Sequence, residues 1–462
     1  MKIVAIGGVA GGMSMASRAK RIDPNAEVIV LEARGYVSFS NCGMPYMIGG
    51  ISEREDLLSR PPEYFAAKGI DARIHSRVTS IDPERKVVSV VTADDPEGYE
   101  LGYDKLVIAT GSRALIPPIA GAEYGFALRS IEDMDRIATE VDEILRAVST
   151  PKAVVIGAGP VGVEMAENLT HRGFGVTLVS RPAHILKSID GELADLVQAR
   201  IEAHSVTVMT GQGAQAIEKV SDTPELRVLL ADGTELEANL VIHAAGARPR
   251  SELGEQIGLE LAPDGSIITD GYGRTSNPDV YASGDVAAVE YLDGSKRSAA
   301  LAGLANRGGR RVADAIFLDA IAAGESSVEP PFSIDPKPAL GTEIVQAFDW
   351  AAAQTGIPAA ELDARDDVLR VRIDTTTHAG YYPGSQPLHV VAWFDRADDR
   401  LLGASVVGAD SVDKQINVLA AALHAQMDAE DLAELELAYA PQFGHTKDSI
   451  NLLGYVATNE LH

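Results

Sequence analysis

The feature that most limits the possible folds of this chain is a glycine-rich turn near its N-terminus, set between an apolar strand and a helix. Residues 2–6 have the apolar character of a buried strand, and residues 7–12 read Gly-Gly-Val-Ala-Gly-Gly. Helical spacing follows over 13–22, and a second strand is expected at 27–31, directly before Glu32. Such glycines let the backbone approach a pyrophosphate at a helix N-terminus, and an acid after the second strand binds a ribose hydroxyl. The pattern predicts a βαβ unit that binds a dinucleotide.

A second copy of this pattern lies in the middle of the chain. A strand at 153–156 leads into Gly-Ala-Gly-Pro-Val-Gly at 157–162, and a helix and a strand at 176–179 follow. The next position, which is acidic in the first copy, holds Ser180, and Arg181 comes after it. An acid here favours NAD, whereas a small polar residue beside an arginine accommodates the 2′-phosphate of NADP. We therefore expect NADPH, with NADH as the alternative if Arg181 is only a solvated surface residue.

The composition of the chain narrows its partners and its location. Its 462 residues suffice for roughly three domains, and their net charge of −27 disfavours nucleic acid and anionic membranes as partners. No apolar run is long enough to span a bilayer, and the first residues enter a strand rather than a signal peptide. A single cysteine without a secretion signal favours a reducing compartment. We expect a cytoplasmic protein without a metal site.

That single cysteine, Cys42, lies in the stretch Ser-Phe-Ser-Asn-Cys-Gly-Met-Pro-Tyr at residues 38–46. A lone cysteine cannot form an internal disulfide and is often inert core filler. This one follows the first glycine turn closely, and Pro45 suits the first turn of a helix just beyond it. A thiol before a helix start is favoured as the reactive thiolate. We expect Cys42 to be redox-active rather than core filler.

Three further segments extend the pattern. Each is an apolar strand that ends in a turn of small residues, at 106–112, 240–249 and 277–285, and the last ends in Gly-Asp. With the two glycine turns, this set resembles the disulfide oxidoreductase flavoproteins. The resemblance implies an α/β fold with two Rossmann-like dinucleotide-binding domains, for FAD and for NAD(P)H, and a C-terminal α+β dimerisation domain. Asp285 would hold the ribityl chain of FAD.

The resemblance also implies where the domains begin and end. The expected domains are residues 1–111 with 250–325 for FAD, 150–248 for NAD(P)H and 330–462 for dimerisation. In the C-terminal part, strand-like alternation at 368–373, 388–394 and 401–407 and a helix at 412–426 support an α+β domain. In the resembled family this domain forms a homodimer and completes the active site of the partner subunit.

The residues around Cys42 narrow the resemblance to the single-cysteine group that contains coenzyme A-disulfide reductases and NAD(P)H persulfide or polysulfide reductases. The Cys-x4-Cys pair of relatives such as glutathione reductase is absent. Single-cysteine peroxidases and oxidases typically carry a histidine in the first glycine turn, where this chain has Val9 and Ala10. Persulfide reductases often carry a C-terminal rhodanese domain, and this chain ends at His462 without one. We expect coenzyme A disulfide as the substrate. The alternatives are a persulfide or polysulfide, an NAD(P)H oxidase activity, and a non-catalytic flavoprotein.

The resemblance assigns roles to single residues. Cys42 would form a mixed disulfide, assisted by Tyr439 and by one of Tyr381 and Tyr382, and the alternative for these tyrosines is an ordinary aromatic interface. The residues expected at FAD and NAD(P)H are Gly7, Ala10, Gly11, Gly12, Glu32, Ala33, Arg34, Ser40, Asn41, Ala109, Thr110, Gly111, Arg129, Gly157, Gly159, Pro160, Val161, Gly162, Ser180, Arg181, Gly246, Gly284, Asp285 and Ala302. Those expected at coenzyme A are Ser14, Arg18, Arg21, Ser38, Asn41 and Asn306, with Lys447 and Tyr455 of the partner subunit. For the basic run at 18–21, the alternative is a helix end that balances the helix dipole.

Overall fold

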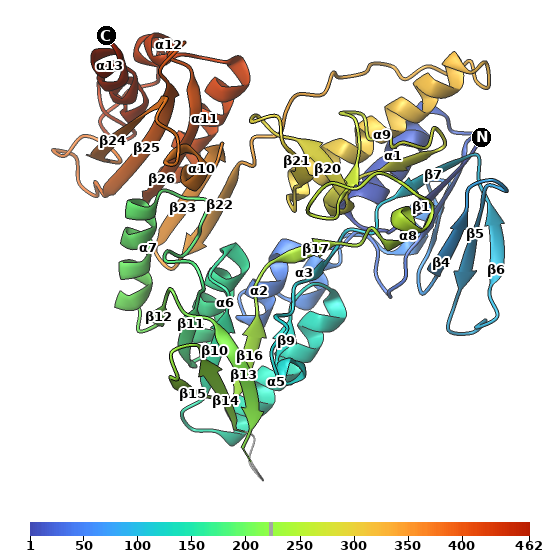
Figure 1. The fold of residues 1–462 in the computed structure, drawn as a ribbon, viewed down its shortest axis with the longest axis horizontal. Coiled ribbons are helices and arrows are strands. Elements are labelled where there is room, and N and C mark those ends of the chain that lie inside the picture. Colours follow the sequence, from blue (N-terminus) through green and yellow to red (C-terminus); the bar gives the residue numbers. More distant parts are fainter. Residues whose placement is uncertain (221–224) are drawn as a thin grey trace. The chain divides into compact units, whose positions relative to one another are not determined.

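The computed structural model describes residues 1–220 and 225–462, which form two compact units (Figure 1). The first unit consists of Met1–Met44, Ser52–Ala114 and Ala247–Ala339, and the second consists of Pro45–Ile51, Leu115–Gly246 and Leu340–His462. The chain therefore first leaves the first unit two residues after Cys42. Among the described residues, no helix combines the length and the apolar character that a membrane crossing requires.

The first unit is built on a parallel five-stranded sheet with the order β19-β7-β1-β2-β3 (Figure 1). Its strands are β1 (Lys2–Ile6), β2 (Glu27–Leu31), β3 (Ile70–Arg73), β7 (Lys105–Ile108) and β19 (Val280–Ala282). The predicted strands at 2–6 and 27–31 are confirmed. The helix between them, α1 (Ala10–Ile22), begins three residues before the predicted 13, because the last residues of the glycine turn already form its first turn.

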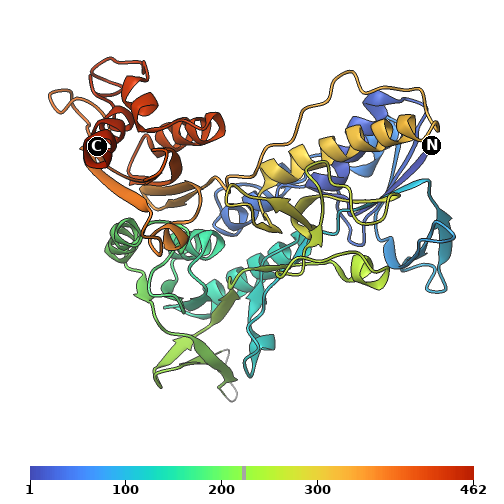
Figure 2. The same ribbon diagram turned by 45° about the horizontal axis from the view of Figure 1, so that its top comes forward.

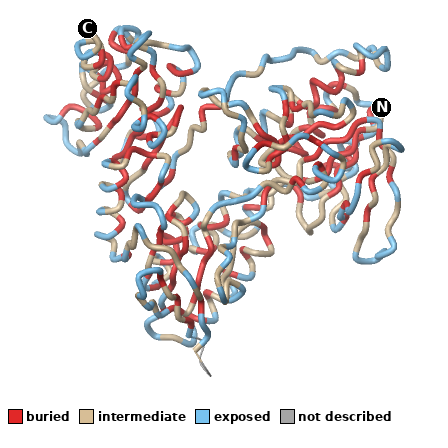
Figure 3. The backbone as a smooth tube through the Cα atoms, in the orientation of Figure 1, coloured by how far each residue is buried: buried red, intermediate tan, exposed pale blue. Residues whose placement is uncertain are grey.

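The two faces of this sheet pack against different layers. Ile3 and Ala5 face a core shared with α1 and with α9 (Ala302–Ala322). Val4 and Ile6 face a core shared with the antiparallel sheet of β4 (Arg77–Asp82), β5 (Val87–Val91) and β6 (Tyr99–Gly102). Burial on both faces explains why the inner strands β1, β2 and β7 are apolar at nearly every position, and Figure 3 shows the buried residues concentrated in this sheet.

Shorter elements complete the first unit. They are η1 (Asn41–Gly43), α3 (Arg54–Leu57), α4 (Pro62–Ala66), β8 (Ser112–Ala114), β17 (Ala247–Pro249), α8 (Glu252–Gln256), β18 (Ile267–Ile268), η3 (Gly284–Val286), β20 (Ala287–Glu290) and β21 (Lys296–Ser298). The helix α2 (Met44–Ile48) begins at the last residue of this part of the chain and continues into the second unit.

The second unit contains another parallel sheet, with the order β12-β11-β10-β16-β9. Its strands are β9 (Phe126–Ala127), β10 (Lys152–Ile156), β11 (Gly175–Val179), β12 (Thr207–Met209) and β16 (Leu240–His243). The accompanying elements are η2 (Ala122–Tyr124), α5 (Ile131–Ala147), α6 (Pro160–His171), α7 (Gly191–Ala203) and the small sheet of β13 (Ala214–Lys219), β14 (Leu226–Leu230) and β15 (Glu235–Ala238). The second predicted βαβ unit is confirmed, and α6 begins at Pro160, where proline suits a first helical turn.

The C-terminal part of the second unit is the predicted α+β arrangement. Its antiparallel sheet has the order β22-β23-β26-β25-β24. Its elements are β22 (Glu343–Ala347), β23 (Trp350–Gly356), α10 (Ala359–Leu362), β24 (Val368–Thr376), β25 (Pro387–Asp395), β26 (Leu401–Gly408), α11 (Val412–Ala425), α12 (Ala429–Glu434) and α13 (Ser449–Leu461). Helix α11 packs on β23 and β26, and α13 packs on β24. This sheet and the second parallel sheet belong to one compact unit, and the domain boundaries proposed from the sequence stay a prediction.

Candidate functional site

The first glycine turn lies against the carboxyl ends of β1 and β7. Gly7 has a φ of +112°, and a Cβ there would lie 2.1 Å from the carbonyl oxygen of Ala109. A Cβ on Gly12, in the first turn of α1, would lie 2.0 Å from the carbonyl oxygen of Gly7. Only glycine therefore fits at both positions. Because glycine has no side chain, the start of α1 can lie close to β1 and β7. Ala10 and Gly11 complete this first helical turn.

The carboxylate of Glu32 is bonded to the same turn. The backbone N–H of Gly8 donates to Glu32 Oε2 at 2.8 Å, and the backbone N–H of Arg34 donates to Oε1 at 2.9 Å. Ala33 lies between them in the chain. The glycine turn, the helix start and the acid after β2 therefore have the relationship that a dinucleotide's pyrophosphate and ribose require. These residues fit the adenine-dinucleotide part of FAD.

The other first-unit residues predicted at FAD gather at the same edge of the sheet. Ala109, Thr110 and Gly111 follow β7, Gly284 and Asp285 follow β19, and Ala302 begins α9. Because β19, β7 and β1 are parallel neighbours, their carboxyl ends meet at one edge. Ser112 Oγ donates to Asp285 Oδ2 at 2.9 Å, which orients the carboxylate at this edge. Arg129, by contrast, belongs to the second unit, after β9.

Cys42 is exposed and lies in η1, two residues before α2. Its stretch is attached to the first glycine turn, because the backbone N–H of Ser38 donates to the carbonyl oxygen of Gly8 at 2.8 Å. Ser38 has a φ of +53°, a conformation that costs energy for a serine and is held by this contact. Pro45 lies in the first turn of α2, as predicted. Since the thiol is exposed, the core-filler alternative is excluded.

Sequence reasoning missed a carboxylate, Glu164, that meets the segment following Cys42. The hydroxyl of Tyr46, on α2, donates to Glu164 Oε1 on α6 at 3.4 Å. Burial raises the pKa of Glu164 to about 7, and the hydrogen bond from Tyr46 opposes part of this rise. Arg172 Nη1 also donates to the carbonyl oxygen of Ile48 at 2.8 Å, so α2 packs on α6 within the second unit. The available sequence signal was a glutamate among apolar residues directly after the second glycine turn.

The second glycine turn repeats the geometry of the first. Gly157 has a φ of +115°, and a Cβ on Gly162 would lie 1.9 Å from the carbonyl oxygen of Gly157. At Gly159 and at Gly246, after β16, a Cβ would meet nothing within 4 Å. Backbone at these two positions therefore borders open space, which a ligand can approach. Pro160 and the exposed Val161 form the start of α6 beside them.

Ser180 and Arg181 follow β11, where the ribose of a coenzyme on the second turn is expected. Ser180 is buried, and its backbone N–H donates to the carbonyl oxygen of Met209 at 2.8 Å. Arg181 is exposed. An exposed guanidinium beside a small residue fits a 2′-phosphate, and no acid follows β11 to oppose it.

Two tyrosines predicted at the reacting sulfur meet in the C-terminal part. The hydroxyls of Tyr381 and Tyr439 lie 3.2 Å apart, and both side chains are exposed. Their hydrogen bond raises the pKa of Tyr439. Tyr382 instead makes an edge contact with His378, with ring centroids 5.6 Å apart. Of the two alternatives, the structure therefore pairs Tyr381 with Tyr439.

The residues predicted at coenzyme A lie in different environments. Ser14 Oγ donates to Asn306 Oδ1 at 2.5 Å, which joins α1 to α9. Lys447, which precedes α13, lies over the ring of Tyr455 on that helix, and its Nζ is 5.7 Å from the ring centroid. Arg21 is exposed and donates to the carbonyl oxygen of Ser17 at 3.0 Å.

Arg18 differs from the other basic residues of α1. Only 4% of its surface is exposed, and its Nε donates to Asp314 Oδ1 on α9 at 2.7 Å. Its Nη2 donates to the carbonyl oxygen of Phe332 at 2.9 Å. The structure therefore does not bring Arg18 to the surface that carries Ser14 and Arg21, and its contact with coenzyme A stays a prediction.

Comparison with known proteins places this geometry in a family. The pyridine nucleotide-disulphide oxidoreductase family matches residues 1–309, and the dimerisation domain of the same family matches residues 343–448. Coenzyme A disulfide reductase of Staphylococcus haemolyticus (strain JCSC1435) is 33% identical over 459 residues, which cover 99% of both chains.

Among the solved structures that align with the whole of this chain are two sulfur-compound reductases. Reduced CoADR-RHD of Bacillus anthracis is 35% identical with a TM-score of 0.91, and 80% of that chain is covered. The NAD-dependent persulfide reductase of A. fulgidus is 34% identical with a TM-score of 0.90, and 83% of that chain is covered. The chain therefore belongs to the pyridine nucleotide-disulphide oxidoreductase family, within its single-cysteine group of coenzyme A-disulfide and persulfide reductases, and is a flavoprotein oxidoreductase.

Proposed function

We propose that this protein uses FAD and NADPH to reduce coenzyme A disulfide through a mixed disulfide on Cys42. The observation that carries the proposal is the position of this thiol. It is the only cysteine, it is exposed, and its stretch is bonded through Ser38 to the glycine turn that fits FAD. A sulfur at this position can meet a small-molecule disulfide on one side and a redox cofactor on the other.

The chain's own residues bind and orient the two dinucleotides. The first glycine turn and Glu32 would hold the adenosine and pyrophosphate of FAD, and Asp285 its ribityl chain. The second glycine turn would hold the pyrophosphate of NADPH, and Arg181 its 2′-phosphate. When bound, FAD accepts a hydride from NADPH and supplies the electron pair that sulfur chemistry needs.

The sulfur step itself belongs to Cys42. Its thiolate attacks one sulfur of the substrate disulfide, breaks the S–S bond and releases the first thiolate, which takes up a proton. The second half of the substrate remains bonded to Cys42 as a mixed disulfide. Two electrons and one proton then free the second thiol and restore the Cys42 thiolate. Reduction of one disulfide thus consumes one hydride from NADPH and one proton from solvent, and gives two thiols and NADP⁺.

The C-terminal tyrosines are proposed to act across a homodimer. Support comes from the match to the dimerisation domain of the family and from the exposure of Tyr381 and Tyr439 in the single chain. In a second copy's active site, their paired hydroxyls would donate a hydrogen bond or a proton to the departing sulfur. Ser14, Arg21, Ser38, Asn41 and Asn306 would contact coenzyme A, together with Lys447 and Tyr455 of the partner subunit. We place this enzyme in the cytoplasm, where thiols remain reduced.

A persulfide or polysulfide is the second candidate substrate, because the A. fulgidus relative is about as similar as the coenzyme A disulfide reductases. The test is anaerobic oxidation of NADPH by the FAD-loaded protein with each sulfur compound. We expect multiple turnovers with coenzyme A disulfide, slower turnover with NADH, and at least about a thousandfold loss in Cys42→Ser with FAD retained.

The same assay separates the other activities. Faster turnover with polysulfide than with coenzyme A disulfide would assign the enzyme to the second substrate. Oxygen uptake that matches NADPH consumption without any disulfide would identify an oxidase, and undiminished turnover in Cys42→Ser would remove the thiol from the mechanism.

A further inference from the structure

A cavity in the first unit lies outside the residues assigned to FAD and to the substrate, apart from Gly284. It has a volume of about 180 Å³. One side is a stripe of α9 that contains Leu304, Ala305, Gly308 and Arg311. The other lining comes from the loop at 269–273, from Ser283 and β20, and from residues 336–339 after α9. Figure 2 shows how the segment after α9 returns along this helix.

Two polar groups of this cavity, the Ser283 hydroxyl and the Arg311 guanidinium, lack a bonded partner among residues 1–220 and 225–462. Ser283 is 3% exposed, and its Oγ makes no hydrogen bond among the described residues. This oxygen borders Gly308, since a Cβ built there would come within 3.1 Å of it. Arg311 is half-buried, and its guanidinium forms no ion pair with a carboxylate in the described part of the chain. Buried polar groups are normally bonded, so the Ser283 hydroxyl points to a missing ligand, and Arg311 lines the same cavity.

The charges around Arg311 favour an anion. Burial lowers the pKa of its guanidinium, and the neighbouring charge of Arg307 lowers it further, so a bound anion would relieve both effects. Lys337 adds another cation to the lining. Of the two lining acids, Asp270 already accepts a hydrogen bond from Arg274 Nη1 at 3.1 Å, and Glu290 is exposed. In a chain of net charge −27, an arginine without a carboxylate is unusual.

We infer that this cavity binds a small tetrahedral oxyanion of the phosphate class between Arg311 and Ser283. A guanidinium offers several donors in one plane, which suits phosphate oxygens, and the serine hydroxyl supplies one more. The cavity's volume of about 180 Å³ is enough to hold such an ion. The inference does not depend on the proposed disulfide reductase activity.

The test is equilibrium dialysis of the FAD-loaded protein against radiolabelled inorganic phosphate at constant ionic strength in potassium chloride. We expect one saturable site per chain, for which sulfate competes and chloride does not. Arg311→Met should weaken binding by about tenfold or more, because it removes the charged donors and keeps most of the side-chain volume. Ser283→Ala should weaken it by a smaller factor of roughly threefold.

The matched control is Arg310→Met, which removes the same charge from the preceding position of α9, outside the cavity lining. Its affinity for phosphate should equal that of the unmodified protein. Equal loss in both arginine variants, competition by chloride, or the absence of a saturable site would overturn the inference. So would release of FAD by Arg311→Met, because the cavity would then be part of the cofactor site. If Arg311→Met does not fold, the Ser283→Ala affinity decides, and an unchanged value would contradict the proposal.

Discussion

Glu164 combines a half-buried carboxylate with a position beside the segment that follows Cys42. Its pKa rises from 4.5 to about 7, first because burial disfavours the charged form. Between these two pH values the folded protein retains a proton on Glu164 that the unfolded chain has released. A raised acid pKa therefore makes the folded state lose stability as the pH rises through this window.

The predicted consequence is a pH-dependent effect of Glu164→Gln. The glutamine keeps an acceptor for Tyr46 but cannot ionise, so the variant should gain about 1–3 kcal/mol of stability over the unmodified protein at pH 8. At pH 5 the two proteins should differ little. Urea unfolding at both pH values measures this, with the exposed Glu202→Gln on α7 as the control. Parallel pH profiles for Glu164→Gln and the unmodified protein would contradict the account.

Single residues were predictable where backbone geometry dictates the amino acid. Gly7 and Gly12 could be placed because no other side chain fits so close to a carbonyl oxygen. The burial of Arg18 could not be predicted, because it depends on the contact with Asp314, almost three hundred positions away in the chain. Glu164 was missed for the same reason, since its burial and its contact with Tyr46 come from the tertiary fold.

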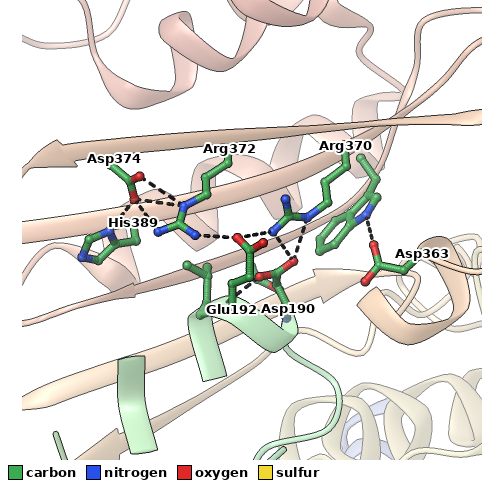
Figure 4. A network of polar contacts seen from close by, with 10 residues as sticks. Asp190, Glu192, Asp363, Arg370, Arg372, Asp374 and His389 are labelled. Carbon is green, nitrogen blue, oxygen red and sulfur yellow. Dashed lines mark hydrogen bonds and ion pairs between the residues drawn. The ribbon is translucent and has the colours of Figure 1, made fainter. Parts of the chain in front are cut away.

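At the scale of elements, an ion-pair network connects the start of α7 to strand β24. Figure 4 shows Arg370 and Arg372 of β24 directed toward Asp190 and Glu192. Arg370 bonds Asp190 at 2.8 Å, where the Asp190 side chain is only 2% exposed. Arg372 bonds Glu192 at 2.5 Å and Asp374 at 3.1 Å, whose side chains are more than half exposed. The network therefore joins helix α7 to strand β24 of the C-terminal sheet through one buried ion pair and several exposed ion pairs.

We predict different effects for the two arginines. Arg370→Ala leaves the buried Asp190 carboxylate without its cation and should lower the free energy of unfolding of the second unit by about 2–3 kcal/mol. Arg372→Ala is the matched control on the same strand and should cost less than about 1 kcal/mol, because its partners are solvated. Denaturant unfolding of both variants gives the comparison. Equal losses would show that burial of Asp190 does not determine the strength of this contact.

The elements themselves were largely readable from the sequence. Apolar strands such as β1 and helices such as α11 carry their own periodicity, and their predicted positions are confirmed to within a few residues. Helix starts at Ala10 and Pro160 were predicted three residues late, because the glycine turns overlap the first helical turns. The three-stranded antiparallel sheets of β4, β5 and β6 and of β13, β14 and β15 were missed, since their buried faces form only by packing on the larger sheets.

At the scale of the whole molecule, the proposal requires two chains for each active site. If Tyr439 acts on the partner subunit's Cys42, a mixture of Cys42→Ser and Tyr439→Phe chains contains dimers with one intact site. Each variant alone should be nearly inactive. After the two are unfolded together and refolded in equal amounts with FAD, about a quarter of the unmodified activity should return, because half of the dimers are mixed and each has one working site of two.

This recovery distinguishes action across the dimer from action within one chain. If Tyr439 served the Cys42 of its own chain, no combination of the two variants would contain an intact site. Activity that stays at the level of the separate variants would then contradict the proposed dimer, provided that each variant refolds with FAD.

The most direct test of the central claim is the intact mass of the protein purified and analysed under non-reducing conditions after exposure to coenzyme A disulfide. We predict one added coenzyme A per chain, located on the peptide that contains Cys42, removed by NADPH in the FAD-loaded protein and absent from Cys42→Ser. A Cys42 that remains unmodified, or an adduct that persists in the presence of NADPH, would contradict the claim that this sulfur passes electrons to a disulfide.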